Sequence, residues 1–314
     1  METNKLGRGA FRYMIFLLLL NAVTLYILYA FVDTDRLLAG PNGANLLRIG
    51  ALLFVVELMV FVFWNCFLVS GWKIGLVTFC LTFIIAFVAE ALGVNFGIVF
   101  GNYYYTDLLG PKIVGVPLLV AMAWEPIIYA SVLLTDMLIP VDKGRPASFV
   151  RRLPLYLGLS MVGAIATTAW DMMMDPFAVS QNWWVWRDGG YYVPYIKDGV
   201  PITNFLGWLG TAFVAQFVCR IVKDYGTRQH QRSVYLSIYG PFCLYLLLFF
   251  MAFSMSMITL HRPEVALIGA MCMGPFIMVA LCRIIALSKN PAFTGSPVTD
   301  DVEMAQSPRP GKGM

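Results

Sequence analysis

The sequence predicts an all-α protein, a polytopic bundle of about eight transmembrane helices with both termini in the cytoplasm. Composition supports this prediction, because 59% of the residues are hydrophobic and only 13% are charged, whereas soluble domains carry about 25% charged residues. Apolar segments of roughly 20 residues, the length that crosses a bilayer, also recur along the chain. The mean hydropathy of +0.73 agrees with both observations.

Eight segments qualify as spans, and we expect them to form one membrane domain over residues 1–287. The first has a basic flank, but its apolar core is too long for a signal peptide, so a retained helix is expected. The segment 288–314 is rich in Pro, Gly, Ser and charge, which predicts a disordered cytoplasmic tail. In chain order the expected spans are 13–32, 49–70, 74–100, 113–139, 153–170, 202–222, 234–260 and 265–287.

Lysine and arginine predict the orientation of these spans. With the N-terminus inside, most of the 22 Lys and Arg residues fall in cytoplasmic segments, as the positive-inside rule requires. The net charge of +4 therefore reflects the distribution of loops, and no nucleic-acid partner is expected.

Several classes of cofactor chemistry are excluded by residue content. The chain has two histidines, His230 and His261, whereas membrane di-iron oxygenases and desaturases need many. No predicted span contains a lysine for a Schiff base, and no glycine-rich phosphate loop is present. The six cysteines lie in or beside apolar spans without a CxxC pair, which is typical of small buried hydrophobes. Neither a metal nor an organic cofactor is expected.

Carboxyl groups inside the predicted spans mark the candidate site, because each costs at least ~2.5–3.5 kcal/mol in hydrocarbon. Counting ~1.5 Å per residue from the helix ends puts them in the outer half of the membrane. The two longest outer loops flank the same layer, so the site should open outward. Each glutamate could instead be a buried structural acid with a polar partner. The polar residues of this layer are Glu57, Glu90, Glu125, Asp171 and Asn204.

Two acids lie one helical turn apart in TAWDMMMDP, at the end of the fifth predicted span. Asp175 precedes Pro176, a pair typical of a helix N-cap followed by proline at the first helical position. A capping role and a catalytic role are both open for Asp175. Asp171 is expected at a helix C-terminus, where the macrodipole disfavours a negative charge. Because capping does not explain Asp171, it is the stronger catalytic candidate.

Aromatic residues gather in the outer loops, in YYYTD and WWVWRDGGYY. They predict either an interfacial aromatic belt or a substrate-binding surface. Glycines at every fourth position from Gly93 to Gly101 predict either close helix packing or a smooth groove for a flat ligand. The candidate substrate-binding residues are Gly93, Gly97, Gly101, Tyr103, Tyr105, Trp124, Trp184, Trp186, Tyr191 and Trp208.

The chemistry that remains is acid catalysis without a cofactor. A carboxyl group buried among apolar groups and other acids keeps its proton nearer neutral pH and can protonate an electron-rich alkene. Aromatic faces would shelter the carbocation by cation–π attraction, and a second acid would orient the attacking water. A membrane prenyltransferase, suggested by the DxxxD string, is disfavoured because a second acidic motif and a basic diphosphate-binding cluster are missing.

Several motifs together resemble the membrane-type carotenoid biosynthesis protein family, which includes bisanhydrobacterioruberin hydratase. They are AEALGVNFGIVFGNYYYTDLLGPKIVGVPLL, TAWDMMMDP, WWVWRDGGYY and VPITNFLGW, within residues 75–215. The resemblance implies a carotenoid hydratase, which adds water to the terminal (1,2) double bond of an acyclic end group and leaves a tertiary hydroxyl. By position it supports as hallmark residues Glu90, the stretch 101–105, Gly110, Pro117, Trp124, Asp171, Asp175, Pro176, Trp186, Gly190, Tyr191, Asn204 and Trp208.

The catalytic hypothesis assigns Asp171 as the general acid and Glu90 as its partner or as the base that orients water. Asn204 is assigned as a ligand of that water. Asp175 and Glu125 complete the candidate catalytic set, and Glu125 stands where the family pattern suggests an apolar residue, so it could add a proton donor.

The expected partners are an acyclic or monocyclic carotenoid, water and the lipid bilayer, with other enzymes of the carotenoid pathway as further candidates. The expected location is a prokaryotic inner membrane. The alternative from another class is a non-catalytic membrane protein that binds or transports a carotenoid or another isoprenoid in the same groove. Its acids would then be structural or proton-coupling groups.

Overall fold

A computed structural model describes residues 12, 15–16, 19–20, 23, 43–138, 149–187, 191–192, 199–226 and 234–288. Within them, seven helices are long and apolar enough to cross a membrane, which confirms the all-α polytopic class. The predicted span 13–32 and the predicted tail lie almost entirely outside the described residues. The seven helices are α3 (Gly43–Ser70), α4 (Trp72–Phe96), α5 (Leu118–Leu138), α6 (Phe149–Ser180), α7 (Ile202–Gly226), α8 (Val234–Ser254) and α9 (Pro263–Ser288).

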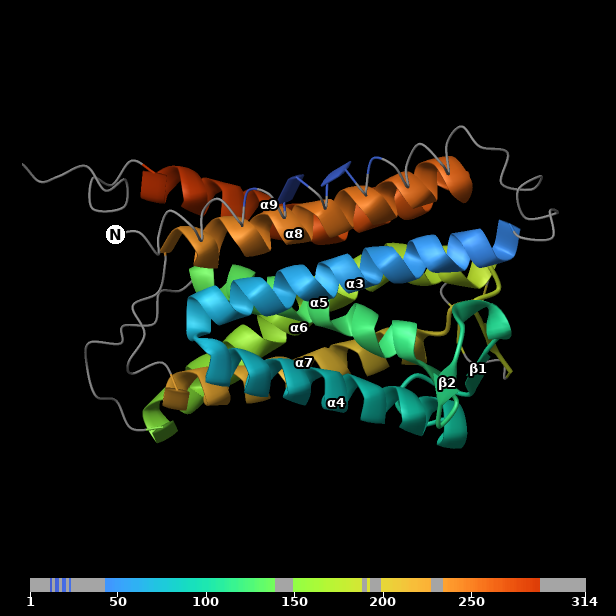
Figure 1. Cartoon of the computed structure of the whole chain (residues 1–314), viewed down its shortest axis with the longest axis horizontal. Coiled ribbons are helices and arrows are strands. Elements are labelled where there is room, and N and C mark those ends of the chain that lie inside the picture. The colour runs from blue at the N-terminus through green and yellow to red at the C-terminus, as the bar shows by residue number, and fades with distance from the viewer. Residues whose placement is uncertain are drawn as a thin grey trace, which may run out of the picture.

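The helices run side by side along the long axis of the molecule, and the described strands lie at one end of the bundle (Figure 1). We call this end the strand end and the other the opposite end. The most enclosed helix is α5, since 72% of its span is buried, against 28% of the span of α9. It contacts α3, α4, α6 and α8, so side chains of α5 can join groups from distant parts of the chain.

Two predicted spans have wrong ends near residues 97–117. The helix α4 ends at Phe96 rather than at residue 100, because Gly97 adopts a left-handed conformation (φ 67°) and its N–H bonds to the Gly93 carbonyl. Glycine takes this conformation without steric cost, which is why it commonly ends helices. The chain then forms short strands, so α5 begins at Leu118 rather than at residue 113.

The predicted end of the fifth span at residue 170 is also wrong, because α6 continues through both acids to Ser180. Pro176 lies inside this helix, and membrane helices tolerate an internal proline when neighbouring groups satisfy the freed carbonyl. The capping interpretation of Asp175 is therefore wrong, and Asp171 is not at a helix C-terminus. Both acids project from the same face of one continuous helix, one turn apart.

Among the described residues, four short strands form at the strand end: β1 (Tyr103–Tyr105), β2 (Lys112–Ile113), β3 (Val116–Pro117) and β4 (Trp184–Trp186). The strands β1 and β4 pair antiparallel, with Tyr103 opposite Trp186 and Tyr105 opposite Trp184. A second antiparallel pair joins β2 to β3. Two loops far apart in the sequence are thus tied together across the ends of the helices.

The buried hydrophobic side chains form two clusters. One gathers residues of α3, α5, α6, α8 and α9, and the other gathers residues of α4, α5, α6, α7 and β1. Trp208 of α7 packs against both clusters. The junction between them lies near the strand end, where the acidic residues of α4 and α6 are also found.

Candidate functional site

Glu90 of α4 holds a buried carboxyl group, with only 4% of the residue exposed. Tyr103 and Tyr105 donate their hydroxyl protons to its Oε2, the second at 2.7 Å. The indole N–H of Trp124 donates to Oε1 at 2.9 Å. Both carboxyl oxygens therefore act as acceptors, held by three aromatic donors from β1 and α5.

The alternation of β1 explains the two tyrosine contacts. Successive side chains of a strand point to opposite faces, so Tyr103 and Tyr105 are buried whereas Tyr104 is exposed. The aromatic-belt interpretation is therefore wrong for these two tyrosines. Gly93 makes room for them, because a Cβ at this position would lie 2.8 Å from Tyr103 Cε1. The helix face at Gly93 thus meets a side chain of the protein itself.

Both tyrosines remain hydrogen-bond donors over a wide range of pH. Burial, and then the neighbouring Glu90 carboxyl group, raise the pKa of Tyr103 and Tyr105 well above the ordinary value of 10.0. A phenolate here would lose its hydration and face another negative charge. The clamp on Glu90 is therefore made of protonated phenols.

Asp171 and Asp175 of α6 form a second acidic centre, and both are fully or almost fully buried. The side-chain amide of Asn204, near the start of α7, donates to Asp171 Oδ2 at 3.0 Å and to Asp175 Oδ2. The two carboxyl groups also contact each other. Asp171 Oδ1 has no hydrogen-bond partner in the described part of the protein. Asn204, expected as a ligand of water, thus cross-links the two acids.

Tryptophans connect the two acidic centres. Trp208 of α7 stacks on Trp124, with ring centroids 3.8 Å apart, and Trp124 is the donor to Glu90. Trp184 of β4 lies close to the Asp175 carboxyl group. The pairing of β4 with β1 is what brings Trp184 to this position. The Trp184 ring also packs against the ring of Tyr105, with centroids 5.7 Å apart, and Tyr105 donates to Glu90. The acids of α4 and α6 are therefore linked through Trp184 and Tyr105.

The same tryptophans line an apolar cavity of about 130 Å³. Helices α3, α5, α6, α7 and α8 and the loops of the strand end contribute its wall. A π-helical turn, Met255–Thr259, continues α8 and places Met255 in the wall; such turns are frequent at functional sites. The aromatic lining consists of Phe54, Trp124, Trp170, Trp183, Trp184 and Trp208. The cavity thus borders the side chains that hold both acidic centres.

Trp170 also belongs to this wall and was not among the predicted site residues. It directly precedes Asp171 on α6, and its ring lies 5.9 Å from that of Trp208. The signal that could have revealed it is the aromatic residue beside an intramembrane acid. The two-tyrosine clamp on Glu90 was also missed, because it depends on the pairing of two remote loops.

Several predicted site residues lie elsewhere. Tyr191 is 74% exposed, and Gly97 and Gly101 occupy positive-φ positions in the turn after α4. Trp186 donates its indole N–H to the Phe100 carbonyl at 3.2 Å and does not line the aromatic cavity. Its ring packs instead against Tyr103, so it supports the clamp on Glu90.

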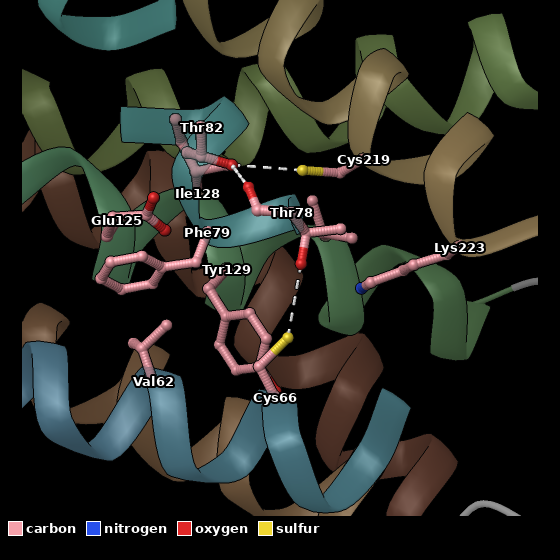
Figure 2. Close-up of a pocket in the computed structure, with 11 residues that line it drawn as sticks. Val62, Cys66, Thr78, Phe79, Thr82, Glu125, Ile128, Tyr129, Cys219 and Lys223 are labelled. Carbon is pink, nitrogen blue, oxygen red and sulfur yellow. Dashed lines mark hydrogen bonds between the residues drawn. The ribbon is translucent and has the colours of Figure 1, made fainter. Parts of the chain in front are cut away.

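Glu125 is not part of either acidic centre. It lines a second, smaller cavity with Cys66, Cys219 and Lys223 (Figure 2). Lys223 was expected just beyond its span, but it is only 5% exposed and lines this interior cavity. The expectation that the spans contain no interior lysine is therefore wrong for Lys223, since its long side chain can reach inward from the end of α7.

A further buried polar cluster surrounds Arg220, at the opposite end of the bundle. Its Nε lies 3.4 Å from Asp136 Oδ1. Its two other nitrogens donate to the hydroxyl groups of Ser160 at 3.3 Å and Thr135 at 2.5 Å, and to Gln216 Oε1 at 3.3 Å. Residues of α5, α6 and α7 are thereby joined around one cation that has a matching acid.

These features define a class, an integral membrane protein in which buried acids and tryptophans surround an apolar cavity. Across the described residues, no three His, Cys, Asp or Glu side chains converge as a metal site. The profile of a family described as carotenoid biosynthesis protein matches residues 49–276. This match covers more than half of the chain and both acidic centres, so the protein belongs to that family and acts in carotenoid biosynthesis. No curated protein and no solved structure matches the chain significantly.

Proposed function

We propose that the protein is a carotenoid hydratase, which adds water to the terminal (1,2) double bond of an acyclic carotenoid end group and leaves a tertiary hydroxyl. One observation carries the proposal: a buried aspartate pair lies behind the wall of an aromatic cavity, and one of its carboxyl oxygens has no hydrogen-bond partner among the described residues. Protonation of an isolated alkene needs an acid in an apolar, aromatic environment. Family membership supports a carotenoid as the substrate.

Asp171 is the proposed general acid. Two carboxyl groups in contact cannot both ionise in a low-dielectric site without strong repulsion, so the pair with Asp175 should retain a proton. The Asn204 amide donates a hydrogen bond to Oδ2 of each aspartate. Asp171 Oδ1 is therefore the oxygen proposed to deliver the proton. Such a step contributes roughly 10²–10⁴-fold to the rate.

Protonation forms a C–H bond at one alkene carbon and leaves the positive charge on the tertiary carbon. The indole faces of the cavity stabilise this cation. Because both oxygens of Glu90 already accept hydrogen bonds, a proton on Glu90 would have to displace a donor. Glu90 is therefore proposed as a fixed negative charge near the cation, and Asp175 takes the role of the acid's partner.

Water then completes the addition. Its oxygen bonds to the tertiary carbon, and one of its protons passes to the aspartate pair, with Asp175 as the proposed acceptor. The pair thereby recovers the proton that Asp171 gave, so each cycle consumes one alkene and one water. No redox cofactor is needed for this balance.

The cavity volume supports entry of an end group rather than of the whole pigment. About 130 Å³ suits a terminal isoprenoid unit, so the remaining polyene would lie between helices or in the bilayer. Trp184 both lines the cavity and lies close to Asp175, so we propose that the end group reaches the acids beside this ring. Acyclic and monocyclic carotenoids both present such an end. A prokaryotic inner membrane, shared with other carotenoid-pathway enzymes, is the proposed location.

The test is the pigment mass from lycopene-accumulating cells that express the wild type or Asp171→Asn in ¹⁸O-labelled water. We expect a pigment heavier by one labelled water with the wild type alone. The same assay on a panel of acyclic and monocyclic carotenoids covers other substrates. If the stably inserted wild type hydrates none of them, the proposal is wrong.

The second candidate function is a non-catalytic membrane protein that binds or transports a carotenoid. The same apolar cavity favours it, because the residues that line the cavity are almost all hydrophobic. A binder would retain pigment after Asp171→Asn and form no product with either version. A prenyltransferase is less well supported, since the described residues that line the cavity include no Lys or Arg for a diphosphate.

A further inference from the structure

The second cavity lies between α3, α4, α5 and α7, and eleven residues line it (Figure 2). Its volume is about 20 Å³, and it shares no lining residue with the aromatic cavity. Its polar lining consists of Cys66, Thr78, Thr82, Glu125, Tyr129, Cys219 and Lys223. The mechanism proposed above uses none of these side chains.

Glu125 brings to this cavity a buried carboxyl group that is not fully hydrogen-bonded within the described structure. The residue is 2% exposed, and its Oε1 has no hydrogen-bond partner among the residues that the structure describes. A buried carboxyl oxygen without a donor is costly, and more so in a membrane-spanning helix, where lipid offers no hydrogen bond. Figure 2 shows the carboxyl group among the other lining residues. We therefore expect the hydrogen-bond donor to Glu125 Oε1 to be a bound molecule rather than a protein side chain.

The two thiols of the cavity are themselves donors. Thr82 gives its hydroxyl proton to the Thr78 carbonyl at 3.0 Å, so Cys219 must be the donor in its 3.2 Å contact with Thr82 Oγ1. Thr78 likewise donates to the Ile74 carbonyl, so Cys66 is the donor in its 3.5 Å contact with Thr78. Both sulfurs thus keep their protons and are not thiolate ligands.

Charge and size restrict the occupant further. The Nζ of Lys223 lies 5.8 Å from the centre of the Tyr129 ring, so the cavity already has a cation in its lining and disfavours a second. A volume of about 20 Å³ exceeds the roughly 10–15 Å³ that one water needs and is too small for an organic molecule. The occupant must be small, neutral and a hydrogen-bond donor.

We propose that this cavity is a specific binding site for one water molecule, which donates a hydrogen bond to Glu125 Oε1. The other hydrogen-bonding positions of the water face the polar side chains that α4 and α7 contribute to the lining. It therefore links the carboxyl group of α5 to two neighbouring helices. The proposal does not depend on the hydratase function.

The experiment is infrared spectroscopy of the full-length protein in lipid nanodiscs, in ordinary water and in H₂¹⁸O. We expect the wild type to show an O–H stretching band, separate from bulk water, that moves to lower frequency with the heavier isotope. Val62→Ile adds one methyl group, about the size of a water, to the cavity wall and should abolish the band while Glu125 is intact. Glu125→Gln should keep the band at a changed frequency, because an amide oxygen is a weaker acceptor.

The matched control is Val60→Ile, which makes the same change on α3 at a residue that is 54% exposed. It should leave the band in place. If the wild type shows no isotope-sensitive band of this kind, the proposal is overturned. It is equally overturned if the band persists unshifted in both Val62→Ile and Glu125→Gln.

Discussion

The two ends of α6 and α7 carry buried polar clusters of opposite design. At the opposite end, Arg220 is matched by Asp136 and by hydroxyl and amide groups from three helices. At the strand end, Asp171 and Asp175 contact each other and Asn204, and one carboxyl oxygen has no partner in the described structure. A matched charge holds helices together, whereas unmatched acids beside a cavity are typical of a functional site.

The largest expected effect is on activity, from Asp171→Asn. Removing the general acid should lower formation of hydrated pigment by about 10²–10⁴-fold, while the similar shape of asparagine should leave folding almost unchanged. Labelled pigment per amount of inserted protein is the measurement, with thermal unfolding in detergent beside it. Asp107→Asn is the control, because the Asp107 side chain is 99% exposed. A loss of less than tenfold in both Asp171→Asn and Glu90→Gln would contradict the catalytic assignment.

The opposite result is expected for Arg220→Met, which breaks the matched cluster. Leaving Asp136 without its cation should lower the free energy of unfolding by about 3–5 kcal/mol. Activity per folded molecule should change little, since the cluster lies far along α7 from Asn204. Denaturant titration in detergent measures the loss. Arg262→Met removes an ion pair with the half-exposed Glu264 and should lower the free energy of unfolding by at most about 1 kcal/mol. Equal losses of stability in Arg220→Met and Arg262→Met would contradict the special role of the matched cluster.

A smaller effect is expected from the clamp on Glu90. Trp124→Phe removes one of the three donors but keeps an aromatic ring beside Trp208. Loss of one hydrogen bond to a charged group is worth about 1.5–3 kcal/mol, so hydration should fall by roughly 10–100-fold. Steady-state assays should place the loss in kcat rather than in KM. Trp72→Phe, at the exposed start of α4, is the control, and a pure KM effect would show that Trp124 acts through substrate binding alone and not through Glu90.

The smallest effect concerns Tyr103 and Tyr105 at high pH. Their pKa is raised in the folded protein above the ordinary value of 10.0, so above that pH the folded state binds more protons than the unfolded chain. The free energy of unfolding should therefore be unaffected below about pH 9 and should fall as the pH rises through the ordinary pKa. Denaturant titrations across this range measure the slope.

The double variant Tyr103→Phe/Tyr105→Phe should show a shallower decline in alkaline solution. Tyr191→Phe, at an exposed tyrosine, should keep the slope of the wild type. If the free energy of unfolding falls equally with pH in the double variant and in the wild type, the two phenols do not titrate as their burial suggests.

Particular residues show which features of the site could be predicted from the sequence. Asp171 and Asp175 were predicted as candidate acids at the end of a span, but the structure puts both inside one continuous helix, with the Asn204 amide bonded to each. The role of Gly93 was not predictable, because its open side is filled by Tyr103 from a strand. Glu125 and Glu90 lie at similar predicted depths, yet they line separate sites, since depth along a helix does not say which way a side chain points.

By itself the sequence determined the membrane-spanning helices, because hydropathy and the cost of a buried charge act locally along the chain. It also indicated candidate catalytic acids, of which Glu125 lies in a separate cavity. Tertiary structure alone decided that α6 passes through Pro176, that β1 pairs with β4, and that two tyrosines clamp Glu90. These features depend on contacts between segments remote in sequence, where packing and hydrogen bonding override local propensity.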